Sequence, residues 1–389
     1  MVRPIARLTS SGFRKPYPNV VNKQLIPPAV FAALDAIWTQ EDYPARDILV
    51  FRIPGAYVVG EHIILDREYR FIENANSAAS DAEIATAIEM AKASDSAGRT
   101  TRVAAPTIYA KGHGANNYGH YLLDVLPRVM IAGKMFGSQG MVYLVRDSRI
   151  AMQDVTYRSF RLLSVSLDNI IVHRAGSTYF VDDLVVITGL FHHQAGTYVS
   201  ALAVRAVEEF AQKMWDMAVP LVRRAYPRLF VRRVVGPKRG RSLHNEQELY
   251  ARLAPFGFKD IDPGSLSLEQ QIVLFSQAQT IIGATGAAMA NIVFCRPGTK
   301  VTLLVPAMFP DSFFQYIAAH KQLCYCEIRC PQTAYDGEAP WEAGSRIEEK
   351  DIQHLVDSVD SFRGWRASRS TPSPPHVSSV VSPTRPVQG

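Results

Sequence analysis

Three side chains suited to acid–base and anion chemistry recur every four residues in segment 117–128: His120, Asp124 and Arg128. Residues four apart lie on one face of an α-helix, so the spacing predicts that all three project together. The residues between them are mostly leucine and valine, which predicts a buried opposite side. A histidine and a carboxylate so placed could take up a proton, while the arginine could bind an anion or pair with the carboxylate.

The flanking residues predict where this helix begins and bends. We expect it to begin near Tyr118, because Asn116 or Asn117 is a suitable N-cap. Pro127 lacks a backbone N–H and therefore predicts a kink or a restart. A polar face beside a kink is typical of a cleft lining. The alternative is an amphipathic surface helix whose His and Asp are only solvated.

The composition is that of a globular chain with room for two domains: 389 residues, 47% of them hydrophobic and 20% charged. No run of about eighteen apolar residues occurs, and residues 1–30 are basic and rich in proline. We therefore expect neither a transmembrane helix nor a secretory signal. Three of the four cysteines lie within seven residues, which favours a reducing compartment over a disulfide framework. The expected location is the cytoplasm.

Positive charge is concentrated between Asp216 and Glu246, although the net charge is only +6. This stretch contains no acidic residue and eight basic ones: Arg223, Arg224, Arg228, Arg232, Arg233, Lys238, Arg239 and Arg241. It predicts a polyanionic partner, which could be a diphosphate, a nucleic acid or an anionic membrane surface bound peripherally. The alternative is a solvated basic linker.

Strand and helix patterns alternate along the chain, which predicts layered α/β domains. In the first half we expect strands at 48–53, 56–65, 102–109, 141–145, 170–173 and 184–188, and helices at 81–93, 155–163 and 200–217. In the second half we expect strands at 229–234, 259–261, 280–282, 301–305 and 323–328, and helices at 245–253, 267–276 and 287–293. The second pattern predicts a doubly wound sheet of the Rossmann type. A hinge at 218–226 divides the chain into domains 1–217 and 218–345, followed by a helix at 346–365 and a disordered tail at 366–389.

A glycine-containing turn after the strand at 280–282 is a possible anion site. It opens a helix rich in small residues and includes Gly283, Thr285, Gly286, Ala287 and Asn291. Free N–H groups at a helix start favour an anion, and glycine lets a ligand approach the backbone. Arg233 and Arg241 flank another strand-to-helix turn, and arginine suits the paired oxygens of a phosphate. Glycine for packing alone, and a capping role for Asn245 and Glu246, are the structural alternatives.

Metal binding is the weaker interpretation of two other clusters. His320, Cys324, Cys326 and Cys330 could form a zinc set, but Cys330 is expected to lie past the end of a strand, so we expect ordinary buried thiols. Asp260 and Asp262 precede Pro263 and Gly264, which favours a turn over a metal pair.

These motifs, taken in order, resemble the family 61 glycosyltransferases, which in bacteria are often capsular polysaccharide biosynthesis proteins. The motifs that carry the resemblance span about 103–328 and are Asn117-Tyr-x-His-x-x-x-Asp-x-x-Pro-Arg128, Arg233 with Arg241, Asn245-Glu246, the segment 266–278, Gly283-x-x-Gly-Ala and Asn291. The resemblance implies a GT-B-like α/β architecture, with two Rossmann-like domains facing a central cleft. The first domain would be on the acceptor side, and the second would bind the nucleotide sugar.

The resemblance also implies a reaction and roles for residues. It implies an inverting, metal-independent hexosyl- or pentosyltransferase without a cofactor, using a nucleoside diphosphate sugar and a glycan acceptor. Asp124 would be the general base, with His120 as the alternative base or as a group that orients the substrate. Asn117 and Arg128 would bind substrate, and the donor would lie against Arg233, Arg241 and the 283–291 turn. Two positions depart from the family pattern: Thr285 stands where relatives commonly have His, and where they commonly have Glu this chain has Leu303 or a neighbour, all without a carboxylate.

Three hypotheses follow. The first is a glycosyltransferase that builds a surface or capsular glycan. The second is a non-catalytic scaffold of the same fold that binds nucleotide sugar or glycan, which the changes at Thr285 and Leu303 favour. The third, nucleic-acid binding through the basic stretch, is disfavoured because only Tyr226 and Phe230 interleave with its basic residues.

Overall fold

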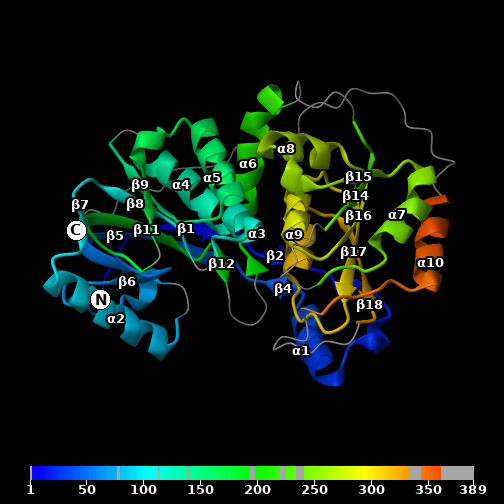
Figure 1. The fold of residues 1–389 in the computed structure, drawn as a ribbon, viewed down its shortest axis with the longest axis horizontal. Helices are drawn as coiled ribbons and strands as arrows, with labels where there is room; N and C mark the ends of the chain where they lie inside the picture. The colour runs from blue at the N-terminus through cyan, green and yellow to red at the C-terminus, as the bar shows by residue number, and fades with distance from the viewer. Residues whose placement is uncertain are drawn as a thin grey trace.

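The computed structural model describes residues 2–76, 79–112, 114–137, 140–174, 176–192, 198–218, 225–233, 241–332 and 343–360. It contains two large β-sheets that lie side by side, with helices between and around them (Figure 1). Most of the expected hinge at 218–226 and the whole expected tail at 366–389 lie outside the described residues.

The first sheet is mixed. Its eight strands are β1 (Pro4–Ser10), β5 (Arg46–Val59), β6 (Ile63–Leu65), β7 (Thr101–Val103), β8 (Thr107–Ala110), β9 (Val142–Arg146), β10 (Ile170–His173) and β11 (Thr178–Thr188). The order is β1-β5-β11-β8-β9-β10, with β6 beside β5 and β7 beside β11. Strands β7 to β11 pair in parallel, whereas β5 is antiparallel to β1, β6 and β11. Only the parallel part is therefore Rossmann-like.

Four helices accompany this sheet: α2 (Asp81–Ser96), α4 (Leu126–Phe136), α5 (Ile150–Leu162) and α6 (Ala201–Ala218). Helix α2 begins with a capping box, in which Ser80 accepts from the Glu83 N–H and the Glu83 carboxylate accepts from the Ser80 N–H. The expected strands at 48–53 and 56–65 are wrong in their division, because one strand runs through Pro54 and Gly55.

The second sheet is fully parallel and doubly wound, as the sequence predicts. Its strands are β3 (Asn19–Val21), β14 (Arg228–Val231), β15 (Lys259–Ile261), β16 (Thr280–Ala284), β17 (Lys300–Pro306) and β18 (Cys324–Cys330), in the order β15-β14-β16-β17-β18-β3. Helices α7 (Glu246–Leu253) and α10 (Glu349–Asp360) cover one face; α8 (Leu268–Gln277), η8 (Ala287–Phe294) and α9 (Phe313–His320) cover the other. The chain winds from β14 to β15 on one side and then to β16 on the other, so the topological switch point lies between β14 and β16.

The N-terminal segment contributes to both sheets. Strand β1 is an edge of the first sheet, and β3 pairs in parallel with β18 of the second. The same segment contains helix α1 (Pro28–Thr39) and two short strands, β2 (Phe13–Arg14) and β4 (Asp42–Tyr43), which pair with each other. The buried Lys15 ammonium ties this segment together by donating to the Ile37 carbonyl (3.0 Å). The division at residue 217 stays a prediction, and β3 extends the second sheet with residues from the first 45.

One hydrophobic core continues from the first sheet into the second. Helix α6 packs against α4 on one side and against α8 and η8 on the other. Short elements complete the described fold: η1 (Lys23–Leu25), η2 (Glu73–Ala75), η4 (Leu167–Asn169), η6 (Ala254–Phe256), η7 (Pro263–Ser265) and the paired β12 (Phe191–His192) and β13 (Tyr198–Val199). The junction of the two halves is thus closely packed along α6.

Candidate functional site

The helix with the spaced polar residues begins as the sequence predicts but is not a regular α-helix. Asn117 is the N-cap of α3 (Tyr118–His120), and its side chain accepts from the Gly119 N–H (2.9 Å). A π-helical turn, η3 (Tyr121–Val125), follows and leads directly into α4. Pro127 cannot donate a backbone hydrogen bond, and it lies in the first turn of α4, so the helix restarts there as the sequence predicts. The 3.6-residue period fails in the π-helical turn, so His120 and Asp124 face different surroundings.

Asp124 and Arg128 form a buried ion pair. One Arg128 nitrogen, Nη2, lies 2.8 and 3.0 Å from the two carboxylate oxygens, and the two side chains are only 2% and 7% exposed. Nη1 of Arg128 donates to the Lys111 carbonyl (2.6 Å). A Cβ at Gly112 would lie 2.9 Å from the Asp124 carboxylate, so this glycine makes room for the pair. The negative charge of Asp124 is therefore compensated inside the first half.

His120 lies instead where the two halves meet. Its ring is half-buried, with the Phe191 ring centroid at 4.9 Å and the Phe313 ring stacked at 6.4 Å. Phe191 belongs to β12 and Phe313 begins α9 of the second half. The backbone of Gly114 also approaches closely, because a Cβ there would lie 3.1 Å from Nδ1 of His120.

Hydrogen bonds join the His120 helix to the second half. The Tyr118 hydroxyl donates to Oδ1 of Asn291 (2.8 Å), and Nδ2 of Asn291 donates to Oε1 of Gln271 (2.8 Å). Asn291 is fully buried, and Nδ2 also donates to the Ala288 carbonyl. A Cβ at Gly119 would touch Ala290 of η8 at 3.3 Å, so α3 lies directly on η8. The amide of Asn291 thus holds the junction together, whereas the sequence placed it among the donor contacts.

The donor-side residues gather at the switch point of the second sheet. Arg233 follows β14, while Thr285 and Gly286 follow β16. The Arg233 guanidinium donates to the Thr285 carbonyl and fills the space that a Cβ at Gly286 would occupy. The Thr285 hydroxyl is buried, at 1% residue exposure, without a hydrogen-bond partner among the described residues. Carboxyl ends of strands at a switch point are where open α/β sheets bind ligands.

The other two turn residues have separate roles. Gly283 serves packing, because a Cβ there would lie 2.8 Å from the Met289 sulfur and 2.9 Å from both Cβ and O of Val231. Ala287 begins η8, which is a 3₁₀-helix and not the expected α-helix. Its tighter winding still leaves the first N–H groups without intrahelical acceptors.

Arg241 and Glu246 border the same end of the sheet. The backbone of Arg241 is left-handed (φ 64°), and its guanidinium lies 5.0 Å above the Phe309 ring, on the β17–α9 loop. A Glu246 carboxylate oxygen accepts from the Arg233 N–H (2.9 Å), and burial raises the pKa of Glu246. Asn245 is the N-cap residue of α7 and Glu246 lies in its first turn, as the structural alternative predicts, but the Asn245 side chain does not cap the helix and bonds to the backbone of Ile347 (3.0 and 3.1 Å).

Part of the chain is similar to a known family. Residues 118–302 match the family model Glycosyltransferase 61. A comparison with curated proteins gives no match. The matched range includes every sequence-predicted site residue except Asn117. The match supports the glycosyltransferase resemblance, and with it a sugar donor and a glycan acceptor.

Leu303 stands where the family pattern has a carboxylate, and a different carboxylate, Glu327, lies beside it on the adjacent strand. Leu303 pairs in register with Glu327 of β18, so the two side chains lie on the same side of the sheet. Glu327 is buried and forms an ion pair with Arg329 (2.6 Å). Arg329 also donates to the Phe309 carbonyl (2.8 Å), which fixes the loop beneath Arg241.

The cysteine prediction needs correction. Cys330 is buried, but Cys324 is exposed and Cys326 is half-buried. All three belong to β18 at alternate positions, so Cys330 does not lie past the strand end. Among the described residues, no three His, Cys, Asp or Glu side chains are grouped to hold a metal ion.

The turn prediction is confirmed for Asp262, whereas Asp260 lies within β15. Asp262 accepts from the Gly264 N–H (2.9 Å) at the start of η7, and Asp260 pairs with Arg232. Within the described ranges, no helix is both long and apolar enough to cross a membrane.

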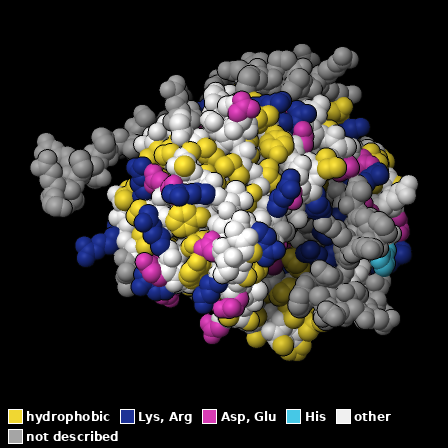
Figure 2. All heavy atoms as spheres, turned by 60° about the vertical axis from the view of Figure 1, so that its left-hand side comes forward, with side chains coloured by type: hydrophobic (Ala, Val, Ile, Leu, Met, Phe, Trp, Pro, Cys, Tyr) yellow, Lys and Arg dark blue, Asp and Glu magenta, His cyan; other side chains and the backbone are white. Residues whose placement is uncertain are grey.

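The basic stretch is not a continuous cationic surface in its described part. Arg232 pairs with Asp260, Arg228 donates to the Phe256 carbonyl, and Arg233 binds the Thr285 carbonyl. Arg223, Arg224, Lys238 and Arg239 lie outside the described residues. Basic and acidic side chains are interspersed on the side of the molecule drawn in Figure 2, and the first sheet carries ion pairs such as Arg102–Asp182 (3.0 Å).

Sequence reasoning named Asn291 but missed the aromatic side chains around His120 and the hydrogen bond from Tyr118 to Asn291. Tyr118, Phe191 and Phe313 come from three distant segments and meet only in the fold. Tyr118 had a signal, since it lies inside the motif that contains His120. Phe191 and Phe313 had none, because they lie in ordinary apolar stretches.

Proposed function

We propose that this protein is an inverting glycosyltransferase that moves a sugar from a nucleoside diphosphate donor to a glycan acceptor, in surface or capsular polysaccharide biosynthesis. One observation carries the proposal. The switch point of a parallel sheet, with Arg233 and the Gly286 turn, lies beside the helix that bears His120, joined to it through Tyr118 and Asn291. The proposal includes a GT-B-like division into two domains and a location in the cytoplasm or at the inner face of the membrane.

The reaction needs two kinds of group, and both have candidates. The acceptor oxygen forms a bond to the anomeric carbon from the face opposite the leaving diphosphate, whose bond to that carbon breaks. The acceptor hydroxyl gives its proton to a base, and the diphosphate leaves with the bonding electrons. Arg233 and Arg241 compensate the charge on the diphosphate, together with the N–H groups that begin η8 after Gly286.

His120 is the better base of the two predicted residues. Asp124 is 2% exposed, and both its oxygens lie within 3.0 Å of Arg128. Both oxygens of this buried carboxylate are thus engaged by one guanidinium, so neither is presented to an acceptor hydroxyl. His120 is half-buried at the junction, where an acceptor hydroxyl can reach it. Asp124 and Arg128 then act as positioning residues that fix the turn following His120.

The donor site is tested by thermal unfolding of the purified full chain with UDP, GDP, CMP and ADP. A ligand that binds only the folded protein at 100 times its Kd stabilises it by about 2.7 kcal/mol. We expect one nucleotide to raise the Tm, and Arg241→Ala to abolish the shift. Arg158→Ala is the control, because this exposed arginine pairs with Asp154 on α5 and should keep the shift. No shift with any nucleotide would refute the donor site.

Turnover then separates the two bases. With the nucleotide sugar selected by the binding test and a panel of glycan acceptors, release of the nucleoside diphosphate is measured. His120→Gln should lose turnover while the nucleotide still raises the Tm. Equal turnover in His120→Gln and wild type would exclude His120 as the base.

The non-catalytic scaffold is the second candidate, because Thr285 and Leu303 replace the His and Glu common in relatives. It predicts that a nucleotide raises the Tm of wild type while no acceptor supports turnover. Restoring the family residues, as Thr285→His with Leu303→Glu, should then be the change that produces activity.

A further inference from the structure

One short segment connects the proposed donor site to His120. It is the loop between β17 and α9, which follows the carboxyl end of β17 and therefore lies at the same edge of the second sheet as the proposed donor turn. The Arg241 guanidinium lies 5.0 Å above the Phe309 ring of this loop. Four residues later, the Phe313 ring lies nearly parallel to the His120 ring, with 6.4 Å between the centroids. Asp311 is midway between these two phenylalanines in the chain.

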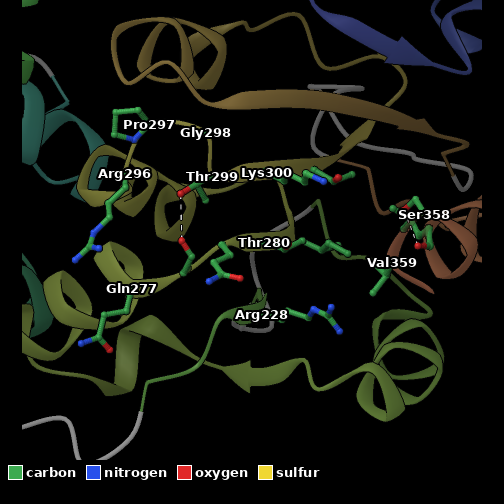
Figure 3. A pocket seen from close by; sticks show the side chains of 15 residues that line it. Arg228, Gln277, Thr280, Arg296, Pro297, Gly298, Thr299, Lys300, Ser358 and Val359 are labelled. Atoms are coloured by element: carbon green, nitrogen blue, oxygen red, sulfur yellow. Dashed lines mark hydrogen bonds between the residues drawn. The ribbon is translucent and has the colours of Figure 1, made fainter. Parts of the chain in front are cut away.

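The other edge of this sheet carries a separate groove of about 460 Å³ (Figure 3). Its lining includes Arg228, Thr280 and Lys300, which are the first residues of β14, β16 and β17. Because these strands are parallel, their first residues lie at the edge opposite their carboxyl ends. The groove is therefore at the opposite end of β17 from Asp311, and it takes no part in the donor site.

Contacts on both sides of Asp311 fix the backbone of the loop. Nη1 of the buried Arg329 donates to the Phe309 carbonyl (2.8 Å). On the other side, Nε1 of the buried Trp38 donates to Oγ of Ser312 (3.1 Å), which is buried as well. A carboxylate on a fixed backbone is suited to selecting between ligands, because little conformational entropy is lost when a ligand binds.

The Asp311 carboxylate lies close to the proposed donor arginine. It is half-buried, and its Oδ1 accepts from the Phe313 N–H (2.9 Å). Burial raises the pKa of this carboxyl above its usual value, whereas two backbone N–H groups and the charge of Arg241 act in the opposite direction. The charge of the buried Glu327 also raises this pKa. The charged form of Asp311 would therefore gain from hydrogen-bond donors on a ligand.

We propose that Asp311 is a specificity-determining residue of the donor site, whose carboxylate accepts hydrogen bonds from hydroxyl groups of the transferred sugar. This inference rests on the proposed transferase function. In that reaction the sugar lies between the diphosphate, bound at Arg241, and the acceptor hydroxyl, which gives its proton to His120. Residues 309–313 lead from Arg241 to His120, which places Asp311 beside the sugar. A carboxylate accepts charge-assisted hydrogen bonds from hydroxyl groups.

The competing explanation gives Asp311 only a structural role. Its bond to the Phe313 N–H joins the loop to the first turn of α9, and aspartate often makes such a contact two residues along the chain. Asp66 makes the same bond to the Glu68 N–H (2.9 Å) after β6 of the first sheet. Asp66 also has an arginine beside it, since it pairs with Arg70 (2.7 Å). It is therefore a matched control for a capping aspartate next to a guanidinium.

Calorimetric titration of the full chain compares nucleotides with their sugar derivatives: UDP with UDP-glucose and UDP-xylose, GDP with GDP-mannose, and ADP with ADP-glucose. Asp311→Asn removes the charge but keeps an oxygen that can accept from the Phe313 N–H. It should raise the Kd of the nucleotide sugar about tenfold, because a charge-assisted hydrogen bond becomes a neutral one, and leave the Kd of the nucleotide unchanged. Asp66→Asn should change neither Kd.

Equal changes in the Kd of nucleotide and nucleotide sugar, or a change confined to the nucleotide, would overturn the proposal, because Asp311 would then act only through Arg241. Unchanged Kd values for every ligand would overturn it too and leave Asp311 a capping role alone. In both cases the nucleotide still binds, so the proposed function stands. If the wild type binds none of these ligands, the donor site fails and this inference fails with it. If Asp311→Asn does not fold, Asp311→Ser replaces it, because serine also accepts from an N–H two residues along the chain.

Discussion

Removing the charge of Asp124 should destabilise the fold strongly, whatever the catalytic base. Asp124→Asn keeps the side-chain shape but leaves Arg128 charged at 7% exposure. Breaking a buried ion pair by neutralising one partner costs about 3–5 kcal/mol. The Asn carbonyl can still accept one hydrogen bond, and Arg128 keeps its bond to the Lys111 carbonyl (2.6 Å). We therefore expect the lower end of that range, about 3 kcal/mol.

Urea unfolding at pH 7 measures this loss, provided that two probes give coincident transitions. The control is Asp154→Asn. Asp154 and Arg158 have the same residue types and the same i,i+4 spacing on α5, but their side chains are 57% and 44% exposed. An exposed pair of this kind contributes about 0.3–0.5 kcal/mol. The two substitutions should therefore differ several-fold in their effect on the free energy of unfolding.

The double variant Asp124→Asn with Arg128→Met isolates the pair. Met removes the uncompensated charge, so part of the stability should return, and a positive coupling energy results. Equal losses in Asp124→Asn and Asp154→Asn would refute the buried-pair argument. A stable Asp124→Asn protein that binds nucleotide but does not turn over would instead restore Asp124 as the general base.

Three further outcomes test the junction and the packing. Gly283→Ala should lower the free energy of unfolding in urea by about 1–3 kcal/mol, because the added Cβ would lie 2.9 Å from Val231. Gly133→Ala is the control: the space around Gly133 on α4 is open, so this substitution should stabilise the protein by about 0.5–1 kcal/mol. Tyr118→Phe should cost about 1–3 kcal/mol, since it removes the hydroxyl bonded to the buried Asn291 amide; no loss would show that another donor replaces it. Burial lowers the pKa of His320 from 6.5 to about 4. The free energy of unfolding should therefore be highest above pH 6.5 and should decrease by up to about 3 kcal/mol as the pH falls toward 4. In His320→Gln the measured pH dependence should be flatter in this window.

The second half was predictable because its sequence follows one repeating unit. Each buried apolar run of a parallel sheet is followed by a helix, and the chain has few ways to connect such units. In this half the strand at Lys259–Ile261 matches its predicted bounds. In the first half the strand at Ile170–His173, which also belongs to a parallel part, does so as well. The capping box at Ser267 and Gln270 shows why α8 was also clear, since both the cap and the apolar stripe lie within eleven residues.

Local rules failed where a contact from a distant segment decided the structure. Pro54 and Gly55 resemble a turn, yet β5 continues through them because β11 pairs on both sides of that point. Strand β3 has only three residues, and its pairing with β18 places it in the second sheet. A pairing of this kind has no signal in the short segment itself.

The site divides in the same way. The spacing of Asp124 and Arg128 left two roles open for the arginine, anion binding and pairing with the carboxylate, and the structure shows the pairing because the i,i+4 relation survives. The predicted common face with His120 is wrong, because a π-helical turn that the proline favours but does not require changes the spacing there. The register that brings Glu327 beside Leu303 depends on the whole sheet.

The two departures from the family pattern have different structural consequences. At Leu303 the side chain joins the hydrophobic core, and Glu327, its register partner on β18, pairs with Arg329, which in turn donates to the loop under Arg241. At Thr285 the buried hydroxyl keeps an unused hydrogen-bonding capacity, while the carbonyl of the same residue orients Arg233. Because buried polar groups are normally satisfied, Thr285 is the position where a bound donor has most to add. On the proposed donor site, the change at Leu303 would therefore alter how the loop under Arg241 is supported, whereas the change at Thr285 would alter a group that faces the donor.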